Sequence, residues 1–314
     1  MVVSASYAHL HAAVRPLADE DAASRIWHIR MDRWIGYARA DAALEALEEL
    51  LDFPQRTRMP NLLVVGPTNN GKTMIVEKFR RAYPRIDAAD NKSRVASVPV
   101  LAVQMPSAPD ESRFCAAILD ELGMPYDNRA RLVALQDAAL RTMRLTGVRM
   151  LVIDELHNLL SGSRSRQRQL LNLLRWLGND LRIPLVGVGT GEALQAINSD
   201  DQLVSRFEPF MLPLWTEGDA YRRLLGTLEA VLPLRRPSNL TDPALSAKIL
   251  TAAEGVLGEV VAIVNRAAVL AVKTGTEAIS ARLIDDIRFI PLSERRRASR
   301  YGAAIWMRSF RQSG

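Results

Sequence analysis

The chain has almost no cysteine, no long apolar run and no internal repeat. Its single cysteine, Cys115, excludes a disulfide framework, is typical of a reducing compartment, and is expected to lie in the core on an amphipathic helix. No run of about eighteen apolar residues is present, so we expect no membrane-spanning helix. The N-terminus also lacks the pattern of a secretory signal peptide, and we therefore expect a cytoplasmic protein.

What is present is an ordinary globular composition with a basic balance. The length of 314 residues allows about two domains, and 48% hydrophobic with 24% charged residues is usual for globular proteins. A net charge of +6 agrees with a polyanionic partner, although many cytosolic proteins are mildly basic.

The segment from Gly66 to Thr73 reads GPTNNGKT and is the strongest functional signal in the chain. A short apolar run precedes it at 61–65, and a helical pattern follows at 74–83. A strand, a glycine-bounded loop and a helix in this order predict a P-loop, in which backbone N–H groups and the helix N-terminus bind phosphate. The expected nucleotide ligands are Gly66, Pro67, Thr68, Asn69, Asn70, Gly71, Lys72 and Thr73.

Two of these residues have separate roles in such a loop. The ammonium group of Lys72 reaches the β- and γ-phosphates, and the hydroxyl of Thr73 binds Mg²⁺. ATP and Mg²⁺ are therefore the predicted cofactors. The alternative is a chance glycine turn before a helix.

An acidic pair ends a second apolar run. Residues 149–158 read RMLVIDELHN, which is typical of a short buried strand followed by Asp154 and Glu155. Ligands of open α/β sheets bind at the carboxyl ends of the strands, so Asp154 is expected to bind Mg²⁺ and Glu155 to polarise the attacking water. The alternative is an acidic strand end that caps the next helix. His157 completes a D-E-x-H pattern, but no further helicase motif is visible, and we interpret it as a structural or supporting residue.

Two more polar residues complete the predicted hydrolytic site. Thr190 ends a buried run at 182–190, where its hydroxyl can bond the attacking water or the γ-phosphate, or instead cap the next helix. Arg206 lies in the segment LVSRFE at 203–208, after a short helical pattern. An arginine supplied to a neighbouring subunit can stabilise charge on the transferring phosphoryl group, and the alternative is a surface pair with Glu208.

The order of patterns predicts two domains with flanking segments. Residues 1–51 form an N-terminal segment that ends in a helix, 52–215 alternate strands and helices, 216–290 are helical only, and 291–314 are a basic tail. Strands are expected near 61–65, 98–104, 149–154 and 184–189, and helices of the second domain at 217–230, 242–253, 257–273 and 280–288. This α/β order predicts a parallel sheet with helices on both faces.

These motifs together resemble the AAA+ ATPases and, more specifically, the TniB family of transposition ATPases related to TnsC. The resemblance rests on MPNLLVVGPTNNGKTMIVEKF at 59–79, DRWIGY at 32–37, IDELHNLLSG at 153–162 and EVVAIVNRAA at 259–268. It implies an AAA+ P-loop core with a parallel sheet and a small all-helical C-terminal lid, and it gives Thr190 the sensor-1 role. In P-loop ATPases of this layout the stretch before the core lines the adenine pocket, here Ile35, Gly36 and Tyr37, for which core packing is the alternative.

The resemblance also implies a function. A TniB-like protein is expected to assemble on double-stranded DNA as a ring or helical filament, and to recruit and activate a partner DDE transposase. One position departs from the AAA+ pattern, because many lids carry a sensor-2 arginine in G-x-x-R, whereas residues 258–261 read GEVV and place Val261 there. This departure predicts weak sensing of the γ-phosphate and slow turnover.

Basic segments are the candidate DNA contacts. The segment SGSRSRQR at 161–168 carries three arginines and no acid, and NKSR at 91–94 is a second candidate. The expected contacts are Lys92, Arg94, Arg113, Arg164, Arg166 and Arg168. No base-reading motif is apparent, which favours sequence-independent contacts to phosphate, and the alternative is a set of solvated charged loops.

Two other function classes share parts of this pattern. A replication initiator or helicase loader has the same core, and a signalling ATPase switch binds a protein effector without nucleic acid.

The tail carries six arginines after Glu294, with Tyr301, Ile305, Trp306 and Phe310 among them. It is expected to dock a partner such as the transposase, and packing on the lid or binding DNA are the alternatives.

Overall fold

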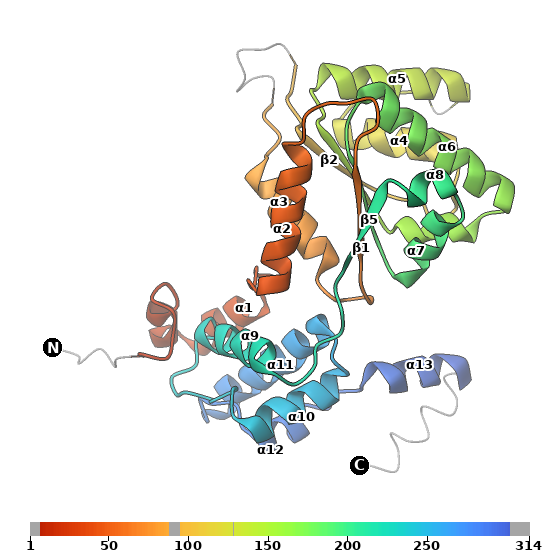
Figure 1. The fold of residues 1–314 in the computed structure, drawn as a ribbon. Coiled ribbons are helices and arrows are strands. Elements are labelled where there is room, and N and C mark those ends of the chain that lie inside the picture. Colours follow the sequence, from red (N-terminus) through yellow and green to blue (C-terminus); the bar gives the residue numbers. More distant parts are fainter. Residues whose placement is uncertain (1–6, 88–94, 128, 302–314) are drawn as a thin grey trace. The chain divides into compact units, whose positions relative to one another are not determined.

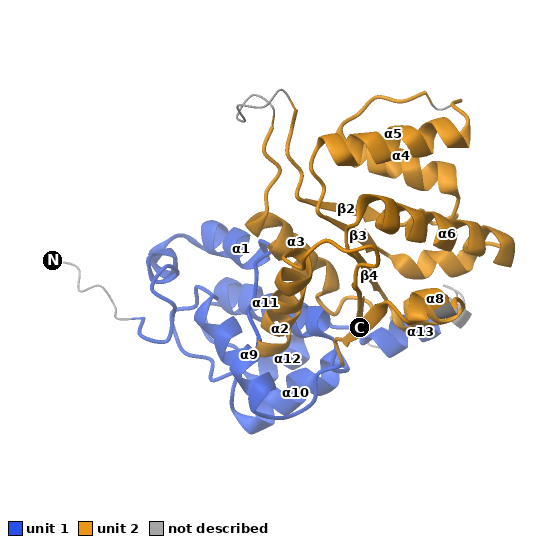
Figure 2. Cartoon of the chain, turned by 45° about the horizontal axis from the view of Figure 1, so that its top comes forward, with its two compact units in different colours: residues 1–37, 214–314 blue, residues 38–213 orange. Residues whose placement is uncertain are grey.

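The computed structural model describes residues 7–87, 95–127 and 129–301. Its chain separates into two compact units (Figure 2). One unit comprises 38–213, and the other joins the described residues of 1–37 to those of 214–314.

The larger unit is built on a five-stranded parallel sheet in the order β2-β3-β4-β1-β5 (Figure 1). The strands are β1 (Asn61–Val65), β2 (Val100–Gln104), β3 (Met150–Asp154), β4 (Leu185–Gly189) and β5 (Phe207–Met211). The first four are mostly apolar and buried along their length, as expected of strands covered on both faces. The predicted α/β fold with a parallel sheet is therefore confirmed.

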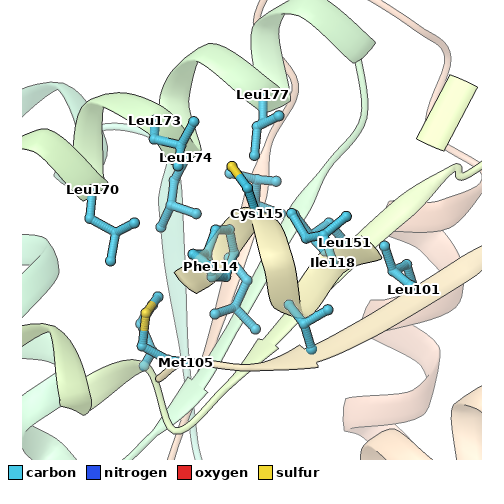
Figure 3. Close-up of a cluster of buried hydrophobic side chains, with 14 of the residues drawn as sticks. Leu101, Met105, Phe114, Cys115, Ile118, Leu151, Leu170, Leu173, Leu174 and Leu177 are labelled. Atoms are coloured by element: carbon cyan, nitrogen blue, oxygen red, sulfur yellow. The ribbon is translucent and has the colours of Figure 1, made fainter. Parts of the chain in front are cut away.

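Helices cover both faces of this sheet (Figure 1). They are α2 (Ala38–Leu51), α3 (Lys72–Ala82), α4 (Glu111–Leu122), α5 (Leu132–Leu145), α6 (Arg164–Leu181), α7 (Gly191–Asn198) and α8 (Asp201–Val204). Figure 3 shows the core between α4, α6 and the sheet, where Phe114 and Cys115 lie among leucines of α6. Burial raises the pKa of the Cys115 thiol to about 12, so Cys115 is the unreactive core residue that its helical pattern predicts.

The smaller unit is helical, as the predicted lid requires. It contains η1 (Arg15–Asp19), α1 (Ala22–Arg30), α9 (Asp219–Ala230), α10 (Pro243–Ala253), α11 (Leu257–Thr274), α12 (Ala281–Asp286) and α13 (Leu292–Tyr301). A bidentate ion pair joins α1 to the loop after α11, with Arg25 nitrogens 2.7 and 2.8 Å from the Glu277 carboxylate. Both side chains are largely buried, so the N-terminal segment is part of this unit.

Two features differ from the sequence-based expectation, and a third, the start of the tail, was left open by it. The segment 1–51 is divided, because α1 packs on α11 while α2 packs on the sheet of the other unit. Strand β5 was not expected, because Pro209 lies within it. Proline has no N–H to donate, but in an edge strand this need not cost a hydrogen bond to the neighbouring strand. The basic tail begins as a helix, α13.

Among the described residues, no single helix is long and apolar enough to cross a membrane. Helices α10 and α11 together have the length and apolar composition of a membrane span, but the pair is bent by 119°.

Candidate nucleotide-binding site

The predicted P-loop connects β1 to α3. Asn69 and Gly71 have positive φ angles of 61° and 84°, and this turn directs the loop into the start of α3. A Cβ atom on Gly66 would lie 2.9 Å from the carbonyl oxygen of Leu212, so only glycine fits where the loop leaves the strand. The backbone N–H of Gly66 donates to the carbonyl of Gly189, which fixes the loop against the end of β4.

Lys72 is buried within this loop. Its Nζ donates to the carbonyl oxygens of Gly66 at 2.9 Å and of Pro67 at 2.7 Å. Burial lowers the pKa of Lys72, and the nearby carboxylates of Asp154 and Glu155 oppose that shift. The ammonium group is thus held at the mouth of the loop by carbonyls that a phosphate can replace as partners.

Asn70 has a different position from the one that its place in the motif suggests. Its side chain is buried, and Nδ2 donates at 3.0 Å to the carbonyl oxygens of both Leu212 and Pro213. The side chain therefore ties the P-loop to the segment after β5, and any contact of Asn70 with phosphate falls to its backbone. No sequence motif signals this tie, because its partners are backbone atoms far along the chain.

Thr73 and Asp154 meet at the carboxyl edge of the sheet. The Thr73 hydroxyl donates to Asp154 Oδ2 at 3.0 Å, and the other carboxylate oxygen accepts the N–H of Glu155 at 2.7 Å. A hydroxyl and a carboxylate are hard oxygen ligands of the kind that Mg²⁺ prefers. The two residues predicted to bind the metal are thus brought together, and their chemistry fits it.

Glu155 follows β3 in a left-handed conformation, with φ 53° and ψ 36°. Its side chain caps no helix, although η2 (Leu156–Ser161) follows directly, and Oε2 lies 3.1 Å from His157 Nε2. The alternative role as a helix cap is therefore absent. A non-glycine residue in this conformation is uncommon, and the contact puts His157 in the position of a supporting residue beside Glu155.

Thr190 lies beside the P-loop, because Val65 and Gly189 are paired in neighbouring strands. It occupies the N-cap position of α7, yet its side chain makes no capping hydrogen bond. In the described part of the chain its Oγ1 is buried without a partner, as is His157 Nδ1. A buried hydroxyl without a partner is rare and is a feature of sites that bind a ligand or water.

Arg206 lies at the opposite end of the strands, where β1 begins. Its carbonyl accepts the N–H of Asn61, the first residue of β1, and its guanidinium donates to Asn179 at 2.8 Å rather than to Glu208. Five strand residues at about 3.3 Å each separate Asn61 from Gly66, a distance of about 16 Å. An arginine side chain is much shorter than that, so Arg206 lies beyond reach of the P-loop in its own chain.

The four described candidate DNA contacts lie at the beginnings of two helices. Arg113 is exposed in the first turn of α4, and Arg164, Arg166 and Arg168 are exposed in the first two turns of α6, a helix rather than a loop. The segments before the two helices touch, because the Ser161 hydroxyl donates to the carbonyl of Ser107 at 2.6 Å. Lys92 and Arg94 lie outside the described residues.

The remaining candidates lie in the helical unit. Ile35 and Tyr37 pack against its core, and the Tyr37 ring meets Trp215 edge-on with centroids 5.1 Å apart. Gly36 lies between them. Val261, in the sensor-2 position of α11, also packs against this core, and Arg266 lies over the Phe289 ring at 5.5 Å.

Comparison with solved structures shows the AAA+ fold. The chain is similar to the Aeropyrum pernix ORC1 protein in complex with DNA, with 18% identity over 84% of this chain and 68% of that one, and a TM-score of 0.59. It is also similar to the Aeropyrum pernix ORC2 protein in ADPNP–ADP complexes, with 16% identity over 83% and 70% and a TM-score of 0.55. Domain III of the Thermotoga maritima initiation protein DnaA matches with 14% identity over 82% and 95% and a TM-score of 0.51.

A sequence family gives a more specific match. The family described as bacterial TniB protein matches residues 25–217, which include the P-loop, the acidic pair and Arg206. No curated protein sequence matches the chain.

Proposed function

The chain belongs to the TniB family, and we propose that it is an ATP-dependent regulator of DNA transposition. The observation that carries this proposal is the convergence of Lys72, Thr73, Asp154, Glu155 and Thr190 at one edge of the sheet, in contacts that suit a nucleotide. ATP hydrolysis, assembly on duplex DNA and recruitment of a transposase are the parts of the proposal. We place this activity in the cytoplasm.

Hydrolysis needs few covalent groups from the protein. Thr73 and Asp154 would hold Mg²⁺, which neutralises charge on the phosphates. Lys72 exchanges its carbonyl partners for phosphate oxygens, and the P-loop amides bind the same chain of phosphates. Glu155 orients the attacking water, with His157 holding the carboxylate, and the free hydroxyl of Thr190 bonds the water or the γ-phosphate.

Arg206 completes the site in a neighbouring subunit. It lies too far from its own P-loop, so its charge can reach a phosphate only when another copy supplies the nucleotide. Hydrolysis by this mechanism requires an oligomer, either a ring or a helical filament, and Arg206 links turnover to assembly.

The arginines at the start of α6 support a DNA-binding surface. The N-terminus of a helix carries partial positive charge, so cations there are unfavourable and acids are preferred. The first turn of α6 contains no acid, while Arg164, Arg166 and Arg168 are exposed in its first two turns. A bound phosphate backbone relieves this repulsion, and an oligomer repeats the contacts along the duplex.

The experiment that tests the function combines sedimentation with an ATPase assay. The wild-type chain should pellet with unrelated duplex DNAs only with ATP or a slowly hydrolysed analogue. Glu155→Gln should bind ATP, pellet with DNA and hydrolyse slowly, whereas Lys72→Ala should bind no ATP and remain in the supernatant. An ATPase that never binds DNA is the result expected of a signalling switch, and it would contradict the proposal.

A second assay separates transposition from replication. A transposase from the same transposon should be retained on DNA by the ATP-bound chain, and a replicative helicase should not. Retention of the helicase alone would favour the initiator or helicase-loader alternative, whose fold the ORC and DnaA structures share.

A further inference from the structure

A large open cavity lies at the edge of the core sheet opposite the P-loop. Its volume is about 900 Å³, and its lining residues come from 56–61 and 204–208. These segments contain the beginnings of β1 and β5. The cavity and the P-loop therefore lie at opposite ends of the same strand, β1.

Three guanidinium groups line this cavity, those of Arg56, Arg58 and Arg206, and Glu208 is the one acid in its lining. Two of the three are engaged, because Arg56 lies over the Phe53 ring at 4.6 Å and Arg206 donates to Asn179. Arg58 is exposed and has no hydrogen bond or ion pair in the described part of the chain.

Arg58 and Arg206 act on each other as like charges. Burial lowers the pKa of Arg206, and the nearby charges of Arg58 and Arg175 lower it further, against the opposing effect of Asp200. Positive charge gathered at a hollow surface stabilises an anion that enters it. The electrostatics of the cavity thus fit a ligand with several negative charges.

We propose that this cavity receives the polyphosphate of a nucleotide held by a neighbouring copy of the chain, with Arg58 as a second cation beside Arg206. The inference rests on the proposed function, because it requires subunits to assemble around ATP. A triphosphate carries more negative charge than one arginine neutralises, and Arg58 supplies a fork of donors without an intramolecular partner to displace. Arg58 therefore touches the phosphates from outside the subunit that binds them.

The test compares Arg58→Ala, Arg58→Lys, Arg206→Ala and the double variant in the full chain. Arg141→Ala is the control, since Arg141 is 72% exposed on α5 and pairs only with Asp137 on the same helix. Each variant is assayed for ATP affinity at dilutions that keep it unassembled, for hydrolysis, and for the salt dependence of duplex binding. Each is also mixed with Glu155→Gln, which retains both arginines.

Arg58→Ala should bind ATP like the wild type and hydrolyse it about 10²-fold more slowly. Arg58→Lys should lie between them, because lysine keeps the charge and loses the fork. The double variant should resemble Arg206→Ala, since both arginines stabilise one transition state. Mixing Arg58→Ala with Glu155→Gln should restore part of the activity, because the inactive partner supplies an intact Arg58.

Several outcomes overturn the inference, and they are distinguishable from failure of the proposed function. If Arg58→Ala hydrolyses ATP normally while Arg206→Ala is defective, the proposed role of Arg58 is wrong and that of Arg206 stands. Normal hydrolysis by both variants would show that neither arginine acts on the nucleotide of a neighbouring subunit. A slow Arg58→Ala with no recovery on mixing places its effect within one subunit, and a flatter salt slope with normal hydrolysis identifies DNA as the occupant instead.

Discussion

At the scale of single residues, Thr190 offers the clearest separation of function from stability. Its hydroxyl is buried without a partner in the described structure, so removing it leaves no other group unsatisfied. Thr190→Val keeps the shape of the side chain, and we expect a thermal midpoint without nucleotide that is equal to or above that of the wild type. Hydrolysis should fall about 10²-fold, because the valine side chain cannot bond the water or the phosphate.

Thr190→Ser is the matched control for this substitution. It keeps the hydroxyl and should hydrolyse ATP at a rate close to that of the wild type. A valine variant that is less stable but fully active would show that the hydroxyl has a structural role only.

A second prediction at this scale concerns Arg164, Arg166 and Arg168. Changing all three to alanine should weaken binding to unrelated duplexes about equally, and it should flatten the slope of log affinity against log salt by about 0.9 for each DNA phosphate that the variant no longer neutralises. Thermal stability should be unchanged or raised, because cations leave the positive end of α6. An unchanged slope would place the DNA-binding surface elsewhere.

At the scale of elements, regular patterns were predictable and irregular ones were not. The run of apolar residues at 61–65 and the helical period at 257–273 correspond closely to β1 and to α11 (Leu257–Thr274). The edge strand β5 was missed because its pattern contains Pro209 and exposed residues, and only pairing with β1 identifies it. A sequence window contains no information about such a partner.

The candidate site shows the same division. Lys72, Thr73 and Asp154 belong to local motifs, and the structure brings them to one edge of the sheet as the strand order requires. The hydrogen bond between Asn70 and the carbonyl of Leu212, and the placement of Arg58 beside Arg206, depend on segments far apart in the chain. These could not be inferred without the fold.

A prediction at the element scale concerns the ion pair between α1 and the loop after α11. Burial alone would raise the pKa of Glu277, but hydrogen bonds from Arg25 and from the backbone of Arg235 hold it below its ordinary value. The pair therefore contributes stability above the unfolded pKa of about 4.3, and this contribution disappears as the pH falls through the lower folded value. Acidification should loosen the helical unit for this reason.

Glu277→Gln should remove that contribution at every pH. It leaves the Arg25 guanidinium, 3% exposed, without a counter-charge, and we expect a loss of about 3–5 kcal/mol in the free energy of unfolding at pH 7. Its stability should then change less than that of the wild type between pH 6 and about pH 3. The control is Asp285→Asn, which breaks an exposed pair with Lys248 and should cost less than about 1 kcal/mol. Equal acid sensitivity of Glu277→Gln and wild type would contradict this account.

At the scale of the whole molecule, the two units have different tasks. The core unit carries the P-loop at the carboxyl end of its strands and Arg206 at the opposite end. This is the arrangement needed for head-to-tail assembly of identical copies. The helical unit has valine at the sensor-2 position, so the proposed oligomer depends on contacts from a neighbour rather than on its own lid to read the γ-phosphate. We therefore predict slow turnover by an isolated chain.

The basic tail is the last part of the molecule with an unassigned task. Its beginning is attached to the helical unit, because Arg295 pairs with the buried Glu259 and the Glu254 carboxylate accepts the N–H of Ser293 at 3.1 Å. The predicted apolar anchors Ile305, Trp306 and Phe310 lie outside the described residues, as does the side chain of Tyr301. Lid packing therefore holds for the first turn of α13, and partner docking remains a prediction for the residues that follow.

Two truncations separate these roles. Removing 302–314 keeps the contacts of Ser293 and Arg295, so thermal stability, ATPase activity and the salt slope of DNA binding should all match the full chain. Recruitment of the transposase should cease, since the aromatic and arginine side chains suited to an interface are removed. Removing 292–314 should in addition lower the thermal midpoint, because the buried Glu259 then loses its ion pair with Arg295. If the shorter truncation retains the transposase and flattens only the salt slope, residues 302–314 bind DNA and the docking prediction is wrong.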